Sequence, residues 1–170
     1  MGRKIIFLIL MFSAAGCSDF KFHVKKDAHK IKPAVILIGQ FDLRNMNYDP
    51  YVSDEFRDAL KFEFFRRGYN SVSVIENGII FTDESDRAAK ICAAHSGDIL
   101  IKGVISQRES GLLADRETDT LISFTVYRKD GIVLAEGFYH DKHLAGEVSL
   151  RRDAADEFVS ELIKNFEQIN

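Results

Sequence analysis

The sequence predicts a single α/β (α+β) domain, a sandwich in which helices pack on one mixed β-sheet. Short apolar runs bounded by Pro or Gly, such as Val35–Ile38 after Pro33, are typical of strands that are buried on both faces. Segments with apolar residues three and four positions apart alternate with these runs and indicate amphipathic helices. The chain has 170 residues, of which 46% are hydrophobic, and this suffices for one core.

The first strand is predicted at 33–41, and a helix is predicted within 49–69. Asp49 or Ser53 would cap its start, because their side-chain oxygens accept hydrogen bonds from free backbone N–H groups. Gly68 would end it as the residue after the C-cap. The apolar side chains that share one helical face are Val52, Phe56, Ala59, Leu60 and Phe64.

A second strand within 69–76, a second helix within 82–97 and a third strand at 98–106 follow. Thr82 or Ser85 would cap the second helix.

A hairpin of strands at 120–128 and 132–140 turns at Asp130-Gly131, a strong two-residue turn signal. The last helix falls within 149–170. The predicted order is therefore β-α-β-α-β-β-β-α. The apolar stripe of the last helix is Leu150, Ala154, Ala155, Phe158, Leu162 and Phe166.

The N-terminus reads as an export signal. Arg3 and Lys4 are followed by eight apolar residues, Ile5–Phe12, and by the small residues 13–16. A transmembrane helix needs roughly 20 apolar residues, so this run is too short to span a bilayer. An ordinary signal peptide, cleaved near Ala15, would leave a free thiol at the following cysteine.

The run Ala14-Ala15-Gly16-Cys17 resembles the lipobox of bacterial lipoproteins, although Ala14 stands where that family prefers Leu. The resemblance implies that Cys17 carries diacylglycerol, that the chain is cut before it, and that its new amine is acylated, for example with palmitate. Ser18, where an Asp would imply retention in the inner membrane, implies the outer membrane.

Three segments follow from this interpretation. Residues 1–16 are a lipoprotein signal peptide, residues 17–32 are the lipidated cysteine and a lysine-rich tether, and residues 33–170 are the globular domain.

The order of elements is similar to the α/β domain shared by the TolB N-terminal region, CsgG and LpoB-type activators of cell-wall synthases. The resembling segments are AVILIGQFD, VSDEFRDALKFEFFRRGYNSV, SGDILIKGVIS and YRKDGIVLAEG. This sequence lacks the propeller of TolB and the long amphipathic pore hairpins of CsgG. The resemblance implies an envelope protein that binds other proteins.

Few residues are candidates for catalysis or for metal binding. His140 and His143 are the best candidate metal ligands, but two imidazoles make half a zinc site, and a solvated loop after a strand is the simpler interpretation. Cys92 and His95 share a helical face and could form a thiol–imidazole pair, but a buried structural thiol is commoner. We therefore assign no catalytic residue, no metal and no cofactor.

The predicted function is that of a lipid-anchored outer-membrane protein, on its periplasmic face or at the cell surface, that binds an envelope protein without catalysis. Leu112 and Leu113, in a predicted loop at Gln107–Thr118, are candidate partner contacts. A surface adhesin is the alternative, and a thiol hydrolase is a remote one. A formal net charge of −3 without a basic patch argues against nucleic acid, and no motif indicates a small-molecule substrate.

Overall fold

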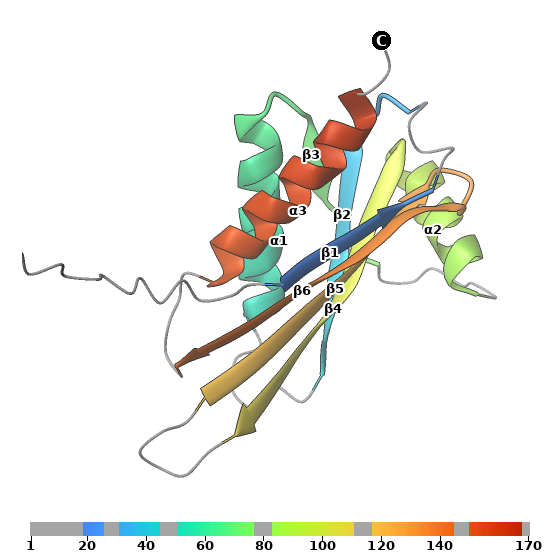
Figure 1. The fold of residues 1–170 in the computed structure, drawn as a ribbon. Helices are drawn as coiled ribbons and strands as arrows, with labels where there is room; N and C mark the ends of the chain where they lie inside the picture. The colour runs from blue at the N-terminus through green and yellow to red at the C-terminus, as the bar shows by residue number, and fades with distance from the viewer. Residues whose placement is uncertain are drawn as a thin grey trace, which may run out of the picture.

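The computed structural model describes residues 19–25, 31–44, 51–76, 83–110, 117–144 and 150–167. These residues form one mixed sheet of six strands with three helices (Figure 1). The elements, in chain order, are β1 (Asp19–Val24), β2 (Ile36–Arg44), α1 (Val52–Arg66), β3 (Ser71–Ser73), α2 (Glu84–His95), β4 (Ile99–Ser110), β5 (Glu117–Arg128), β6 (Val133–Leu144) and α3 (Leu150–Glu167).

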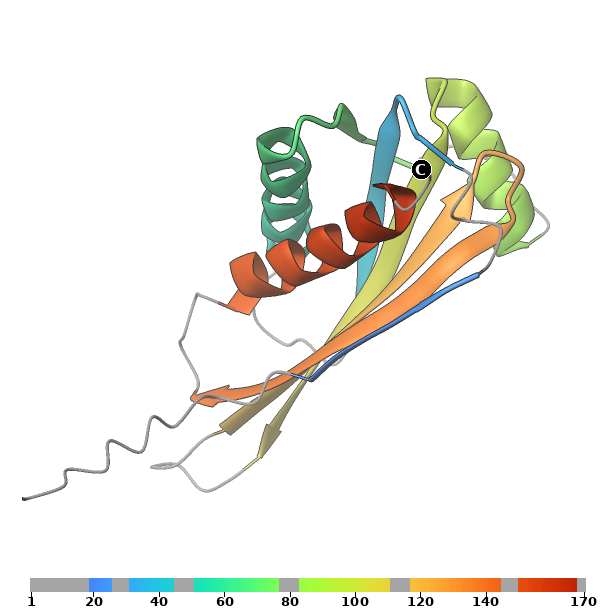
Figure 2. The ribbon, with the colours of Figure 1, turned by 45° about the horizontal axis from the view of Figure 1, so that its top comes forward.

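The spatial order of the strands is β1-β6-β5-β4-β2-β3. β2 runs parallel to β3 and β4, and the other neighbours are antiparallel. Helices α1 and α3 lie on one face of the sheet, and the shorter α2 lies on the other face at one end (Figure 2). The predicted α/β sandwich is therefore confirmed, with one core on each face of the sheet.

Helix α1 ends as predicted but begins differently. Gly68 has φ +81°, and the backbone N–H groups of Gly68 and Tyr69 donate to the carbonyls of Phe65 and Phe64, which is a Schellman motif. The predicted cap at Ser53 is wrong, because the hydroxyl of Ser53 is buried and accepts a hydrogen bond from the backbone N–H of Phe41 at 3.2 Å. Asp49 lies outside the described residues.

Helix α2 is capped by Asp83, whose carboxylate accepts a hydrogen bond from the backbone N–H of Asp86 at 2.8 Å. The predicted cap at Ser85 is wrong, because its hydroxyl instead donates to the carbonyl of Gly131 at 2.7 Å. This bond ties α2 to the β5–β6 turn. Thr82 lies outside the described residues.

The β5–β6 turn differs by one residue from the predicted two-residue turn. Its closing hydrogen bond runs from the N–H of Gly131 to the carbonyl of Arg128, so Lys129 and Asp130 are its central residues. Gly131 follows with φ +84°, in the left-handed region that favours glycine. A turn followed by a left-handed glycine and a bulge is a common three-residue hairpin connection.

The β4–β5 hairpin is longer than predicted. β4 continues to Ser110 and β5 begins at Glu117, and these two residues pair. The predicted loop at Gln107–Thr118 is therefore wrong at both ends, because backbone pairing continues through polar side chains. Leu112 and Leu113 lie outside the described residues.

The N-terminal strand is not among the predicted elements. Asp19–Val24, which fall within the predicted tether, pair antiparallel with β6. Phe20, Phe22 and Val24 face the core under α3, whereas Lys21 and His23 are exposed. Apolar and polar residues alternate in FKFHV, which indicates a strand, but the lysines around this segment also suit a polar tether.

Phenylalanines form the centre of the larger core. Phe124 of β5 stacks on Phe158 of α3 with ring centroids 4.2 Å apart. Its ring also lies 5.8 Å from that of Phe56 in α1, 6.2 Å from that of Phe41 in β2 and 6.4 Å from that of Phe20 in β1. One side chain thus connects five elements.

We expect Phe124→Ala to lower the free energy of unfolding by about 3–5 kcal/mol, because it removes a fully buried ring and leaves a cavity. Urea denaturation monitored by circular dichroism measures this change. Leu121→Ala, on the opposite face of the same strand and 40% exposed, is the matched control and should cost less than about 1 kcal/mol. Equal losses for the two variants would contradict the central role of the ring.

Candidate interaction surface

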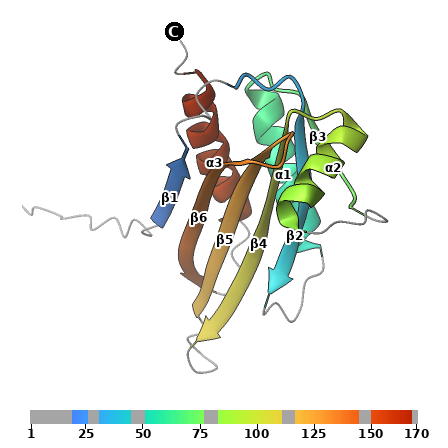
Figure 3. The ribbon, with the colours of Figure 1, turned by 90° about the vertical axis from the view of Figure 1, so that its right-hand side faces the viewer.

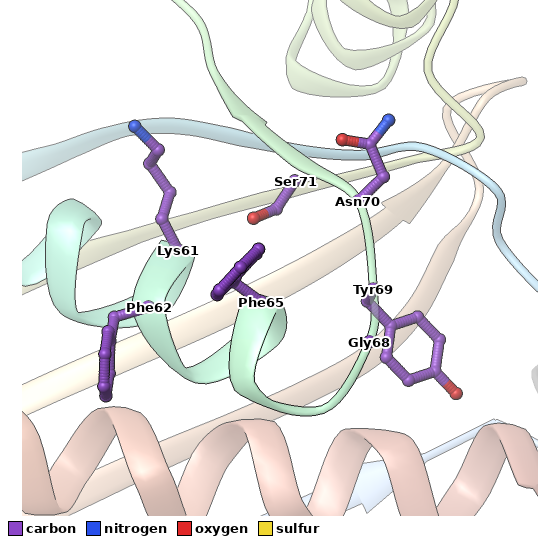
Figure 4. Close-up of a pocket in the computed structure, with 7 residues that line it drawn as sticks. All are labelled: Lys61, Phe62, Phe65, Gly68, Tyr69, Asn70 and Ser71. Atoms are coloured by element: carbon purple, nitrogen blue, oxygen red, sulfur yellow. The ribbon is translucent and has the colours of Figure 1, made fainter.

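A hollow of about 540 Å³ lies between the C-terminal half of α1 and the start of β3 (Figure 4). β3 is the outermost strand of the described sheet on this side. The residues that line the hollow are Lys61, Phe62, Phe65, Gly68, Tyr69, Asn70 and Ser71.

Two phenylalanines beside this hollow are exposed to an unusual degree. Phe65 is 79% exposed and Phe62 is 51% exposed. Both lie outside the buried face of α1, which is formed by Phe56, Leu60 and Phe64. Large exposed aromatic side chains are typical anchors of protein–protein contacts. We call Phe62 and Phe65 the aromatic pair.

The end of α1 that carries the aromatic pair is held to α3 by ion pairs. Arg67 donates to Asp156 at 2.5 Å and to the hydroxyl of Ser160 at 2.7 Å, and it also pairs with the buried carboxylate of Glu63. The hydrogen bond from Arg67 lowers the pKa of Asp156 below its ordinary value, so this carboxylate is charged at neutral pH. The hollow therefore lies beside a fixed helix end.

A second hollow, of about 520 Å³, lies at the opposite edge of the sheet, between β1 and α3. Phe20 and Phe22 form its apolar part. Its rim carries three carboxylates, of which Asp156 pairs with Arg66 and Arg67, and Glu161 pairs with Lys164. The two edges of the sheet thus differ in the residues that line their hollows.

The face of the sheet that α2 leaves open is also hollowed. Two depressions of about 410 and 440 Å³ share Phe138, which is half-buried. Lys21 Nζ lies 5.6 Å from the centre of the Phe138 ring, which is a cation–π distance. In the second depression His140 Nε2 lies 2.5 Å from Asp119 Oδ1.

The solvated loop that the sequence predicts at His140 and His143 is wrong. β6 continues to Leu144, so His140 and His143 are both strand residues, and His140 is occupied by Asp119 of the neighbouring strand. Within the ranges that the structure describes, no three His, Cys, Asp or Glu residues gather in a way that could hold a metal ion.

The candidate thiol–imidazole pair of Cys92 and His95, the remote alternative from the sequence, is not suited to nucleophilic chemistry. Cys92 is 1% exposed and packs with the small core under α2, whereas His95 is exposed. Burial, with a smaller contribution from the charge of Asp98, raises the pKa of Cys92 to about 11. A reactive cysteine needs a lowered pKa, so the geometry favours a structural thiol.

We expect Cys92 to react very slowly with a thiol reagent in the folded protein, because at pH 8 only about one thiol in a thousand is ionised when the pKa is near 11. Absorbance after addition of dithiobis(nitrobenzoate) to a Cys17→Ser chain measures the rate. The same chain in guanidinium chloride should react fully within the mixing time. Rapid reaction of the folded chain would show that the thiol is accessible and activated.

The aromatic pair was not identified from the sequence as a site. Its signal is present there, because KFEFF places Phe62 and Phe65 outside the helical stripe. Cys17, Leu112 and Leu113, which the sequence does single out, lie outside the described residues.

No protein-family model and no curated protein matches the sequence. Solved structures do match. PelC from Paraburkholderia phytofirmans, solved as a dodecamer, is 10% identical with a TM-score of 0.65, over 89% of this chain and 100% of that chain. Lipoprotein GNA1162 from Neisseria meningitidis is 14% identical with a TM-score of 0.54, over 78% and 99%. Protein CT253 from Chlamydia trachomatis, described as hypothetical, is 7% identical with a TM-score of 0.54, over 82% and 100%.

At these identities the matches show a shared fold. One of the proteins with this fold is a lipoprotein. None of the helices in the described ranges is long and apolar enough to span a membrane.

Proposed function

We propose that this protein is a lipid-anchored lipoprotein of the outer membrane that acts, without catalysis, as an assembly module of the cell envelope. The observation that carries the proposal is the exposed aromatic pair beside the β3 edge of a fold that a lipoprotein also has. The run of small residues that ends at Cys17 supports the anchor.

The partner that fits the aromatic pair best is a second copy of this chain. The β3 edge presents the two exposed phenylalanines, whereas the β1 edge presents a hollow that contains Phe20 and Phe22. Two different edges that each carry phenylalanine rings favour head-to-tail contacts, and such contacts form a ring when the rotation closes. The PelC structure, whose fold is similar, is a dodecamer, which supports this choice.

We expect Phe65→Glu to weaken self-association by at least about 30-fold, because a charge would replace an anchor in an apolar contact. Mass photometry of the purified protein over a range of concentrations measures the assembly. Phe65 is 79% exposed, so the variant should fold normally by circular dichroism.

Ile132→Glu is the matched control, since Ile132 is 48% exposed but lies in the β5–β6 turn, away from the hollow. It should assemble as the unchanged protein does. A monomeric unchanged protein, or a Phe65→Glu variant that assembles equally well, would refute self-assembly through this edge.

We expect Cys17→Ser to abolish incorporation of an alkyne-tagged fatty acid and to release the protein from the membrane fraction, because three acyl chains anchor a protein stably. In-gel fluorescence after click labelling of growing cells measures the incorporation. Cys92→Ser should keep its label, since this thiol is buried. A Cys17→Ser protein that still carries the label would rule out the anchor.

A further inference from the structure

The distance between the proposed anchor and the fold is short. β1 begins at Asp19, two residues after Cys17, and two residues span at most about 7 Å. A lipid on Cys17, the anchor proposed above, would therefore hold one end of the sheet close to the bilayer. A long tether before the domain would have imposed no such constraint.

The strand register shows which end this is. Asp19 pairs with His140, which in turn pairs with Leu121, and Leu121 pairs with Ser106. These four residues form one row across the sheet. Beyond Ser106 in this row, β4 continues for four residues to Ser110, which is about 13 Å. The paired ends of β4 and β5 thus extend past the start of β1 (Figure 3), and by more than the two residues before β1 can span.

We propose that this end of the sheet lies against the lipid surface when Cys17 is acylated. The strand-end rim consists of Ser106–Ser110 of β4, Glu117–Leu121 of β5 and His140–Leu144 of β6. The proposed partner of this rim is the bilayer surface, because β1 begins only two residues after the acylated cysteine.

Two described side chains of the rim suit a headgroup layer. Arg108 is exposed and can donate to lipid phosphates, and Leu121 is 40% exposed beside the half-buried ring of Phe138. These residues line the open depression of about 440 Å³ on the sheet face. The carboxylate of Asp119, the acid in this depression, is within hydrogen-bond distance of His140.

The same orientation places the aromatic pair away from the membrane. Ser71, which borders the hollow at the β3 edge, pairs with Ile36, and Ile36 lies in the row of Ile99 and Arg128 at the other end of the sheet. Leu121 and Arg128 are seven residues apart in β5, or about 23 Å. The membrane therefore does not compete with a second copy for this hollow.

Tryptophan fluorescence tests the orientation without background, because the chain contains no tryptophan. We would place single tryptophans at the rim, as Leu121→Trp and separately Arg108→Trp, and at the far end, as Ile132→Trp. The full-length acylated proteins would be reconstituted in phosphatidylcholine vesicles with and without a nitroxide on the lipid headgroup. We expect a severalfold loss of emission for both rim variants and no loss for Ile132→Trp.

Unquenched rim tryptophans, or equal quenching of Ile132→Trp, would overturn the proposal. Failure of the proposed orientation can be distinguished from failure of the proposed lipid anchor. If fatty-acid labelling shows that cells do not acylate Cys17, its thiol can be coupled to a maleimide lipid and the quenching repeated. Rim quenching in that form supports the geometry although the natural anchor has failed, and its absence refutes the geometry.

Discussion

The stack of Phe124 on Phe158 is the contact on which the rest of the fold depends. It joins the middle of the sheet to the last helix, and the neighbouring rings of Phe41 and Phe56 join the same point to β2 and α1. Gly103 makes room for this cluster, since a Cβ there would lie 2.5 Å from the Phe41 ring. A small residue on the central strand thus allows large ones on its neighbours.

The three helices leave parts of the described sheet uncovered. α1 and α3 bury one face, and α2 covers only the end of the other face that contains Leu37 and Leu100. In the described part of the chain, no helix covers the rest of that second face or the two outer edges. The proposed contacts with the membrane and with a second copy would use these uncovered parts.

The predicted elements that the structure confirms are those with strong periodicity. The buried run at the start of β2 and the apolar stripe of α3 are unambiguous, because tertiary packing and local pattern agree there. β1 was missed because its alternating residues lie among lysines. The caps of α1 and α2 were misplaced because several polar residues near a helix start can cap it, and neighbouring strands and turns decide between them.

The site was harder to predict than the fold. Exposed phenylalanines stand out only once the buried stripe of α1 is known, and an edge strand is recognisable only once the strand order is known. The resemblance of residues 14–17 to a lipobox needs no such context, because a processing signal is read from the extended chain.

The pairing of β1 with β6 also orders the folding of the chain. Val24 and Ala135 are more than a hundred residues apart, and closing a loop of that length costs on the order of 4 kcal/mol of chain entropy. β1 therefore adds to a sheet that is already built, since β4, β5 and β6 can pair through the shorter hairpins between them. If Cys17 carries the proposed anchor, β1 is also the strand nearest the lipid, and the membrane-side strand would then gain its partner after the strands of the central sheet have paired.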